Sequence, residues 1–183
     1  MSRERQLLER AGVPREAHAA LLRYLELLTA WSRRVSLSAA RTPEQRIAVL
    51  IEPAVALLPL LQPGALLDVG SGNGTPGLVL ALLDPQRSVT LLEPRARRWA
   101  FLREATRACG RTDIEVRRER HECYAGAPAP NVTVRALRMD GAALRRLIAE
   151  GGQALLSWPL AGARARRTRK GGLPIYVYRP CST

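Results

Sequence analysis

Hydrophobic residues follow a helical spacing in the first third of the chain. Between residues 15 and 35, leucine and aromatic side chains recur every three or four positions with charged residues between them, which predicts an amphipathic helix. A second helix is predicted over residues 42–61, because Thr42 is a suitable N-cap and a Pro-Gly pair follows. Residues 1–63 are therefore expected to form a helical N-terminal extension.

From residue 64 onward, short apolar runs alternate with helical stretches. The predicted strands are 65–69, 88–92, 114–116, 131–137, 153–158 and 175–178, and the predicted helices are 76–83, 95–108 and 141–150. This alternation is typical of βαβ units, so residues 64–183 are expected to form an α/β, doubly wound (Rossmann-like) core with a mainly parallel sheet. We expect one domain over residues 1–183.

The clearest motif is the segment LLDVGSGNGTPG at residues 66–77, which follows the first predicted strand. It places Asp68 at the strand end and glycines at positions 70, 72, 74 and 77. Such a strand-to-helix turn lets the backbone take positive φ and lets a nucleotide-like ligand approach the main chain. The nicotinamide pattern G-x-G-x-x-G needs glycine where Thr75 stands, which disfavours a nicotinamide oxidoreductase. The D-x-G-x-G-x-G spacing instead indicates S-adenosylmethionine.

Glu93 supports this interpretation of the glycine loop. It ends the second predicted strand, where a carboxylate can accept hydrogen bonds from both ribose hydroxyls of a nucleoside cofactor.

Several stretches resemble the bacterial 16S rRNA guanine-N7 methyltransferases, the glucose-inhibited division protein B family. The similarity lies in DVGSGNGTPG (68–77), TLLEPRARRWAFLREA (90–105), Arg120-His121-Glu122 and Val134-Arg135-Ala136, and it spans about residues 20–158. The resemblance implies an S-adenosylmethionine-dependent methyltransferase fold, an rRNA or small-ribosomal-subunit substrate, and transfer to guanine N7.

The resemblance also implies roles for individual residues. It assigns cofactor binding to Asp68, Gly70, Gly72, Gly74, Thr75, Glu93, His121, Glu122 and Arg135. Arg135, between cofactor and target base, and Arg120 would act on the substrate, as guanidinium groups suited to a phosphate or a base edge. The alternative for Arg120 and Arg135 is an ordinary structural ion pair.

The chain also departs from the family pattern. Leu50, Pro53 and Ala54 stand where the family usually has a histidine and an Asp-Ser pair, and Trp158 lies in the segment where it usually has lysine. Trp158 is expected to be a core residue or a stacking partner for a flipped base.

Charge and cysteine content narrow the possible partners and compartment. The net charge of +13 comes almost wholly from arginine, since Lys170 is the only lysine, and it favours a polyanionic partner such as RNA. Five basic residues gather in the predicted exposed loop 159–173, either as a solvated run or as phosphate contacts: Arg164, Arg166, Arg167, Arg169 and Lys170.

Three cysteines without a C-x-x-C pair predict neither a disulfide framework nor a metal site. With no signal peptide or membrane span expected, the predicted location is the cytoplasm.

Three alternatives remain at this point. A methyltransferase acting on a small molecule or protein would be indifferent to added RNA, whereas RNA binding should weaken as salt rises. A catalytically silent relative would bind cofactor and RNA without turnover, and an oxidoreductase would prefer NAD. The target nucleotide, naked RNA against assembled subunit, and the oligomeric state are left open.

Overall fold

The computed structural model describes residues 2–166 and 175–180. The N-terminal extension contains more and shorter helices than the pattern predicted. They are α1 (Arg3–Arg10), η1 (Arg15–Ala17), α2 (His18–Trp31), α3 (Pro43–Arg46), η2 (Ile47–Ile51), α4 (Glu52–Leu57) and η3 (Leu58–Leu60). The predicted helix over 15–35 is α2 with a 3-10 turn before it, and α1 was not predicted.

The prediction of one continuous helix over 42–61 is wrong. Thr42 does cap α3, through a capping box with Gln45, but η2 is a π-helix and η3 a 3-10 helix. Pro53 and Pro59 explain the breaks, because proline has no N–H and its ring clashes with the carbonyl four residues earlier. A π-bulge before Pro53 relieves that conflict within the helix.

In the part of the chain that the structure describes, seven strands form one sheet in the order β3-β2-β1-β4-β5-β7-β6. They are β1 (Leu66–Val69), β2 (Val89–Leu92), β3 (Glu115–Arg117), β4 (Ala129–Val134), β5 (Ile148–Leu156), β6 (Arg164–Arg166) and β7 (Ile175–Tyr178). The first five are parallel, and β7 lies antiparallel between β5 and β6. The doubly wound α/β prediction is confirmed.

Several predicted boundaries are wrong. The fourth strand ends at Val134 rather than at residue 137, and α7 (Gly141–Leu147) ends three residues early. Residues 148–152 instead run beside β4 with a register shift, so closely that a Cβ on Gly152 would lie 2.9 Å from the Pro130 carbonyl oxygen. Residues 164–166 of the predicted loop form β6, while its positions 167–173 lie outside the described residues.

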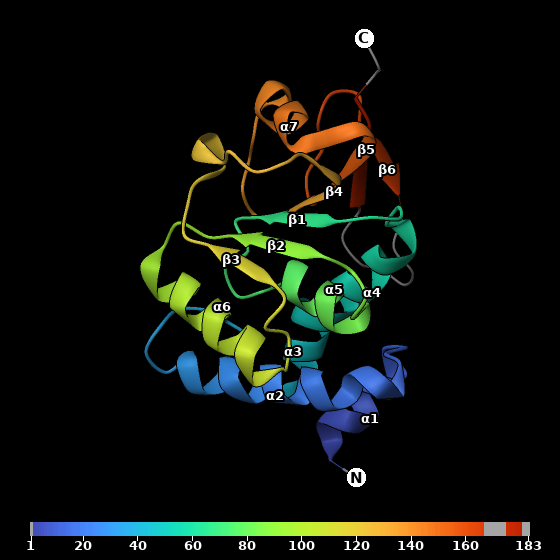
Figure 1. Ribbon diagram of the computed structural model, residues 1–183. Coiled ribbons are helices and arrows are strands. Elements are labelled where there is room, and N and C mark those ends of the chain that lie inside the picture. Colours follow the sequence, from blue (N-terminus) through green and yellow to red (C-terminus); the bar gives the residue numbers. More distant parts are fainter. Residues whose placement is uncertain (1, 167–174, 181–183) are drawn as a thin grey trace.

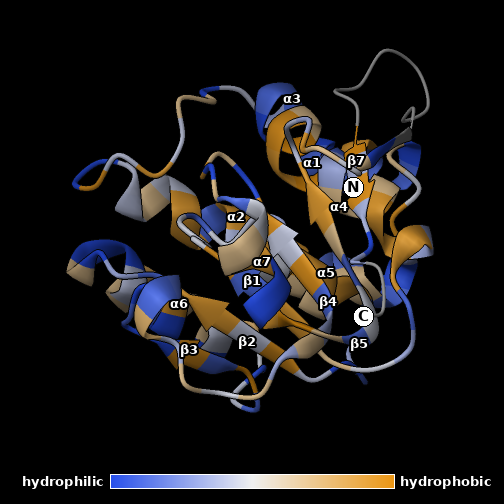
Figure 2. Cartoon of the chain, turned by 90° about the horizontal axis from the view of Figure 1, so that it is seen from above, coloured by the Kyte–Doolittle hydropathy of each residue, from blue (hydrophilic) through white to orange (hydrophobic). Residues whose placement is uncertain are grey.

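Helices cover both faces of the sheet (Figure 1). The N-terminal helices, α5 (Gly77–Leu83) and α6 (Ala96–Ala108) pack on one face, and α7 packs on the other. Figure 2 shows that the strands are mainly hydrophobic, whereas hydrophilic stretches lie on outer helix surfaces such as that of α3. The N-terminal extension shares the larger hydrophobic core with α5 and α6.

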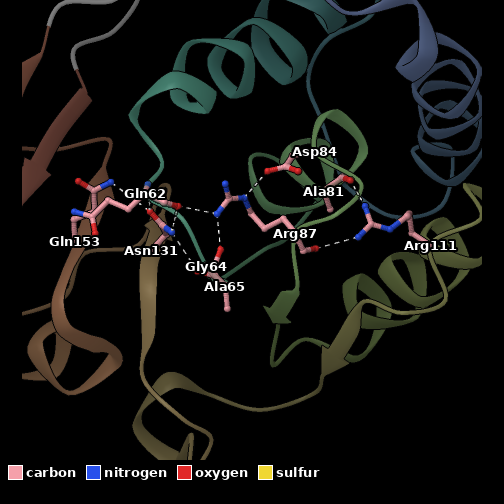
Figure 3. Close-up of polar contacts among 9 residues, drawn as sticks. All are labelled: Gln62, Gly64, Ala65, Ala81, Asp84, Arg87, Arg111, Asn131 and Gln153. Atoms are coloured by element: carbon pink, nitrogen blue, oxygen red, sulfur yellow. Dashed lines mark hydrogen bonds and ion pairs between the residues drawn. The ribbon is translucent and has the colours of Figure 1, made fainter.

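A buried polar network fastens the chain entering β1 to its neighbours (Figure 3). Asn131 of β4 is fully buried; its Oδ1 accepts from the Gln62 amide (2.8 Å), and its Nδ2 donates to the carbonyls of Gln62 (2.9 Å) and Ala65 (3.3 Å). Arg87 continues the network by donating to the Gln62 carbonyl (3.0 Å) while it pairs with Asp84.

Replacing Asn131 with leucine is expected to lower the free energy of unfolding by about 3 kcal/mol, because it leaves buried amide and carbonyl groups without partners. Urea unfolding measures the loss. The exposed Gln86→Leu variant, at the same end of the sheet, serves as control. Equal stability of Asn131→Leu and wild type would show that the network contributes nothing.

Candidate active site

A cleft of about 600 Å³ lies at the carboxyl ends of β1, β2 and β4. The chain leaves β1 toward β2 on one side, while β4 lies on the other, so the cleft opens where the strand order reverses. Ligands of open α/β sheets bind at such a switch point. Its lining comes from the glycine loop, from the segment between β2 and α6, from Arg120, and from the segment after β4.

The glycine loop needs its glycines for conformation. Gly70, Gly72 and Gly74 have φ of +72°, +54° and +91°, values that L side chains rarely adopt. Gly70 and Gly72 line the cleft and bring the main chain to its surface. A Cβ on Gly74 would instead approach Leu78 to 3.1 Å, so this glycine lets the loop pack against α5.

Glu93 joins the end of β2 to the glycine loop. It is buried, and its two carboxylate oxygens accept from the amides of Gly72 (2.9 Å) and Arg95 (2.8 Å). Each oxygen keeps a further lone pair, and the residue lines the cleft. A fixed carboxylate at this place suits the pair of hydroxyls of a ribose.

Asp68 lies beneath the loop and supports it from behind. Its Oδ1 accepts from the Thr133 hydroxyl (2.7 Å), and Oδ2 has no hydrogen-bond partner in the described part of the chain. Burial raises the pKa of Asp68 above its usual value, against the effect of the Thr133 hydrogen bond. A Cβ on Gly77 would lie 2.4 Å from the Asp68 Cβ, so the close packing of β1 on α5 depends on that glycine.

The N-terminal extension holds the loop from the other side. The hydroxyl of the buried Tyr24 of α2 donates a hydrogen bond to the Asn73 carbonyl (2.8 Å), and the same oxygen lies 3.2 Å from the Thr75 hydroxyl. Thr75 donates to the Leu50 carbonyl of η2 (3.2 Å), and the Asn73 side chain donates to the Leu37 carbonyl (3.0 Å). Burial raises the pKa of Tyr24 well above its usual value, so the hydroxyl remains a donor.

Replacing Tyr24 with phenylalanine is expected to weaken cofactor binding about three- to tenfold, because one hydrogen bond to the loop is worth about 1 kcal/mol. Calorimetric titration with S-adenosylmethionine measures this. Tyr124→Phe also removes a hydroxyl bonded to a backbone carbonyl, that of Ala127, and should leave the affinity unchanged. Equal affinity of Tyr24→Phe and wild type would show that the extension does not shape the loop.

Two arginines predicted from the sequence reach the cleft. Arg120 is exposed and Arg135 half-buried, and neither has a carboxylate within 4 Å among residues 2–166 and 175–180, so no ion pair there explains them. Burial lowers the pKa of the Arg135 guanidinium, an effect opposed by nearby Tyr24 and Asp68. Arg135 therefore presents a partly desolvated charge to the cleft.

The backbone after Arg135 is strained. Ala136 has φ +56°, the one positive φ among described residues other than glycine, and its amide donates to the Ser157 hydroxyl (3.3 Å). Left-handed geometry costs a residue with a Cβ of order 1 kcal/mol. The turn places Ala136 and Leu137 in the cleft wall beside Arg135.

The sequence comparisons decide the family. The family model GidB, rRNA small subunit methyltransferase G, matches residues 17–157. This chain belongs to that family. Relatives named ribosomal RNA small subunit methyltransferase G include one from Granulibacter bethesdensis, 43% identical over 79% of this chain and 70% of the relative. Another, from Xanthomonas axonopodis pv. citri, is 38% identical over 75% of this chain and 63% of the relative.

The chain thus spans about two thirds of the length of these relatives. Among solved structures, precorrin-6y C5,15-methyltransferase from Geobacter metallireducens aligns with a TM-score of 0.53 at 14% identity. That alignment covers 79% of this chain and 92% of the other. The fold is the Rossmann-like fold of S-adenosylmethionine methyltransferases.

Six of the residues assigned from the GidB resemblance line one cleft: Gly70, Gly72, Thr75, Glu93, Arg120 and Arg135. Four others do not line it. Asp68 lies behind the loop, and Gly74 is the loop glycine that faces Leu78 of α5. His121 and Glu122 form the short helix η4 (His121–Cys123), where the His121 Nδ1 lies 3.2 Å from Glu122. The role of each in cofactor binding stays a prediction.

Arg95 and Arg98 line the cleft and were not predicted. The signal lay in the sequence, because PRARR directly follows Glu93 and a helix start places residues three apart on one face. Arg98 is half-buried and donates to the Ser36 carbonyl (3.3 Å), and its Nη1 would lie 3.7 Å from a Cβ on Gly72.

The departures from the GidB pattern have structural roles here. Leu50 and Ala54 are fully buried in the larger core, and Pro53 follows the π-helix. Trp158 is partly buried and packs against the buried hydrophobic residues on the α7 side of the sheet, which fits the expectation of a core tryptophan.

In the described ranges, no group of three or more His, Cys, Asp or Glu residues is placed to hold a metal ion. The same part of the chain contains no helix with the length and apolar character needed to cross a membrane.

Proposed function

We propose that the protein transfers a methyl group from S-adenosylmethionine to a guanine N7 of small-subunit rRNA, in the cytoplasm. The observation that carries the proposal is that, in a chain of the GidB family, the glycine loop and the Glu93 carboxylate line the same cleft as Arg120 and Arg135.

The cleft residues fit the cofactor chemically. Glu93 offers free lone pairs on a buried carboxylate to the ribose hydroxyls, and the positive-φ glycines expose backbone without side chains between them and a ligand. When bound, S-adenosylmethionine supplies an electrophilic methyl group. Tyr24, Asn73 and Thr75 keep the loop in place, so that the cofactor's position does not depend on loop ordering at each turnover.

Transfer to guanine N7 asks the protein for orientation rather than proton removal. Guanine N7 has an available lone pair, so it can accept the methyl group in line with the carbon–sulfur bond that breaks, without first losing a proton. Arg135 sits at the end of β4, where its guanidinium fork suits a base edge or a phosphate, and the turn at Ala136 fixes the backbone beside it. Holding the guanine nitrogen and the methyl donor in this orientation can by itself increase the rate of transfer by a large factor.

Incubation with methyl-labelled S-adenosylmethionine and either small-subunit rRNA, small subunits, or no RNA tests the proposal. Label is expected in RNA only, and Gly72→Asp, which adds a side chain and a negative charge beside Glu93, should abolish it. Cofactor binding without transfer to either RNA substrate would contradict the proposal and favour a silent relative. RNA-independent transfer would favour a small-molecule or protein substrate.

A further inference from the structure

We infer that Arg95 and Arg98, at the start of α6, bind backbone phosphates of a single-stranded RNA segment that crosses the cleft mouth toward Arg135. The inference rests on the proposed function, because it assigns the substrate's path over the same cleft.

The charge of the cleft is strongly one-sided. Among the described residues, four arginines line it, Arg95, Arg98, Arg120 and Arg135, and Glu93 is the one carboxylate that does. Both oxygens of Glu93 already accept backbone amides. In the described ranges, none of the four guanidinium groups lies within 4 Å of a carboxylate.

Three arginines outside the cleft are paired with carboxylates. Arg87 contacts Asp84, Arg111 contacts Asp113, and Arg117 contacts Glu115, all at 2.9 Å or less. Arg87 and Arg111 also donate to backbone carbonyls, those of Gln62 and Arg87. The four cleft arginines differ from these in the absence of any such carboxylate partner in the described ranges.

The cofactor cannot neutralise this charge. S-adenosylmethionine carries a sulfonium, an ammonium and one carboxylate, so it adds one net positive charge to the cleft. Its single carboxylate can satisfy one guanidinium. An additional anion is needed for the others, and the phosphates of RNA supply several at regular spacing, with geometry that suits the guanidinium fork.

The arginines mark a path across the mouth of the cleft. Arg95 is the N-cap of α6, Arg98 lies in its first turn, and both line the cleft. The hydrogen bond from Arg98 to the Ser36 carbonyl holds its side chain against the N-terminal extension, close to Gly72. Arg120 follows β3, and Arg135 follows β4 on the far side of β1. An RNA strand that touches all four arginines would lie over the glycine loop, and its target base could enter the cleft between these arginines.

The dependence of RNA affinity on salt tests the inference. For single strands, the slope of log K against log salt changes by about 0.7 for each phosphate contact. The Arg95→Gln/Arg98→Gln variant should reduce the slope by about 1.4. Arg107→Gln, an exposed arginine in the last turn of the same helix with no ion pair among the described residues, should leave it unchanged.

Calorimetric titration of the same variants with S-adenosylmethionine completes the experiment. Unchanged cofactor affinity with the reduced slope would support phosphate binding by Arg95 and Arg98. An unchanged slope, or a loss confined to cofactor affinity, would overturn it. Methyl transfer by the wild type is scored separately, so that failure of the proposed function is distinguished from failure of this assignment.

Discussion

Replacing Glu93 with alanine is expected to weaken S-adenosylmethionine binding by about 100-fold or more. The change removes a buried carboxylate that would accept two ribose hydroxyls, and charge-assisted hydrogen bonds contribute about 1.5 to 3 kcal/mol each, against 1.4 kcal/mol per tenfold. It also leaves the Gly72 and Arg95 amides without their acceptor, which loosens the glycine loop. Calorimetric titration measures the affinity.

Glu104→Ala is the matched control for this variant. Glu104 lies on α6 and makes no hydrogen bond or ion pair with another described side chain, so its loss should change the affinity less than twofold. Thermal unfolding of both variants checks whether the fold is intact. If Glu93→Ala bound the cofactor within threefold of wild type, the ribose assignment would be wrong.

Replacing Gly77 with alanine is expected to lower the free energy of unfolding by about 3 kcal/mol, near the upper end of what overpacking costs. The added Cβ would lie 2.4 Å from the Cβ of Asp68 and 2.5 Å from its Oδ2. Asp68 cannot move away freely, because β1 pairs with both β2 and β4. The collision must therefore shift α5 from the sheet. Urea unfolding followed by circular dichroism measures the loss.

Gly141→Ala provides the comparison. Gly141 also begins a helix, but the nearest atom to its added Cβ is an Arg145 side-chain nitrogen at 3.5 Å, and its φ is not positive. This variant should be neutral or slightly more stable, since alanine favours helices over glycine. Equal effects of the two substitutions would show that the Asp68 contact is not tight.

The sheet was predictable because each of its central strands is a short apolar run followed by turn residues. Segments in which one local signal conflicts with another, or with tertiary contacts, were not predictable. Pro53 lies between the Thr42 cap and the Pro63-Gly64 stop, so these two end signals predicted one helix where the backbone is broken by a π-helix. Residues 148–150 continue the helical pattern of α7, yet pairing with β4 draws them into β5, an effect of tertiary contacts.

The site was predictable where the backbone itself dictates residue type. Glycines at positive φ and a carboxylate at a strand end can be recognised from spacing, and Gly70, Gly72 and Glu93 do lie in one cleft. The loop's other supports could not be predicted, because Tyr24 and Leu50 reach it only through packing of distant helices. Arg98 was overlooked although PRARR directly follows Glu93, because an arginine on a basic helix resembles an ordinary exposed charge.

The most direct test of the central claim is the chemical identity of the methylated nucleotide. Small-subunit rRNA lacking the modification would be incubated with the protein and S-adenosylmethionine, digested, and mapped by mass spectrometry. A single N7-methylguanosine, absent when Gly72→Asp replaces the wild type, is the expected result. A methyl group on another base or atom, or none on RNA despite tight cofactor binding, would contradict it.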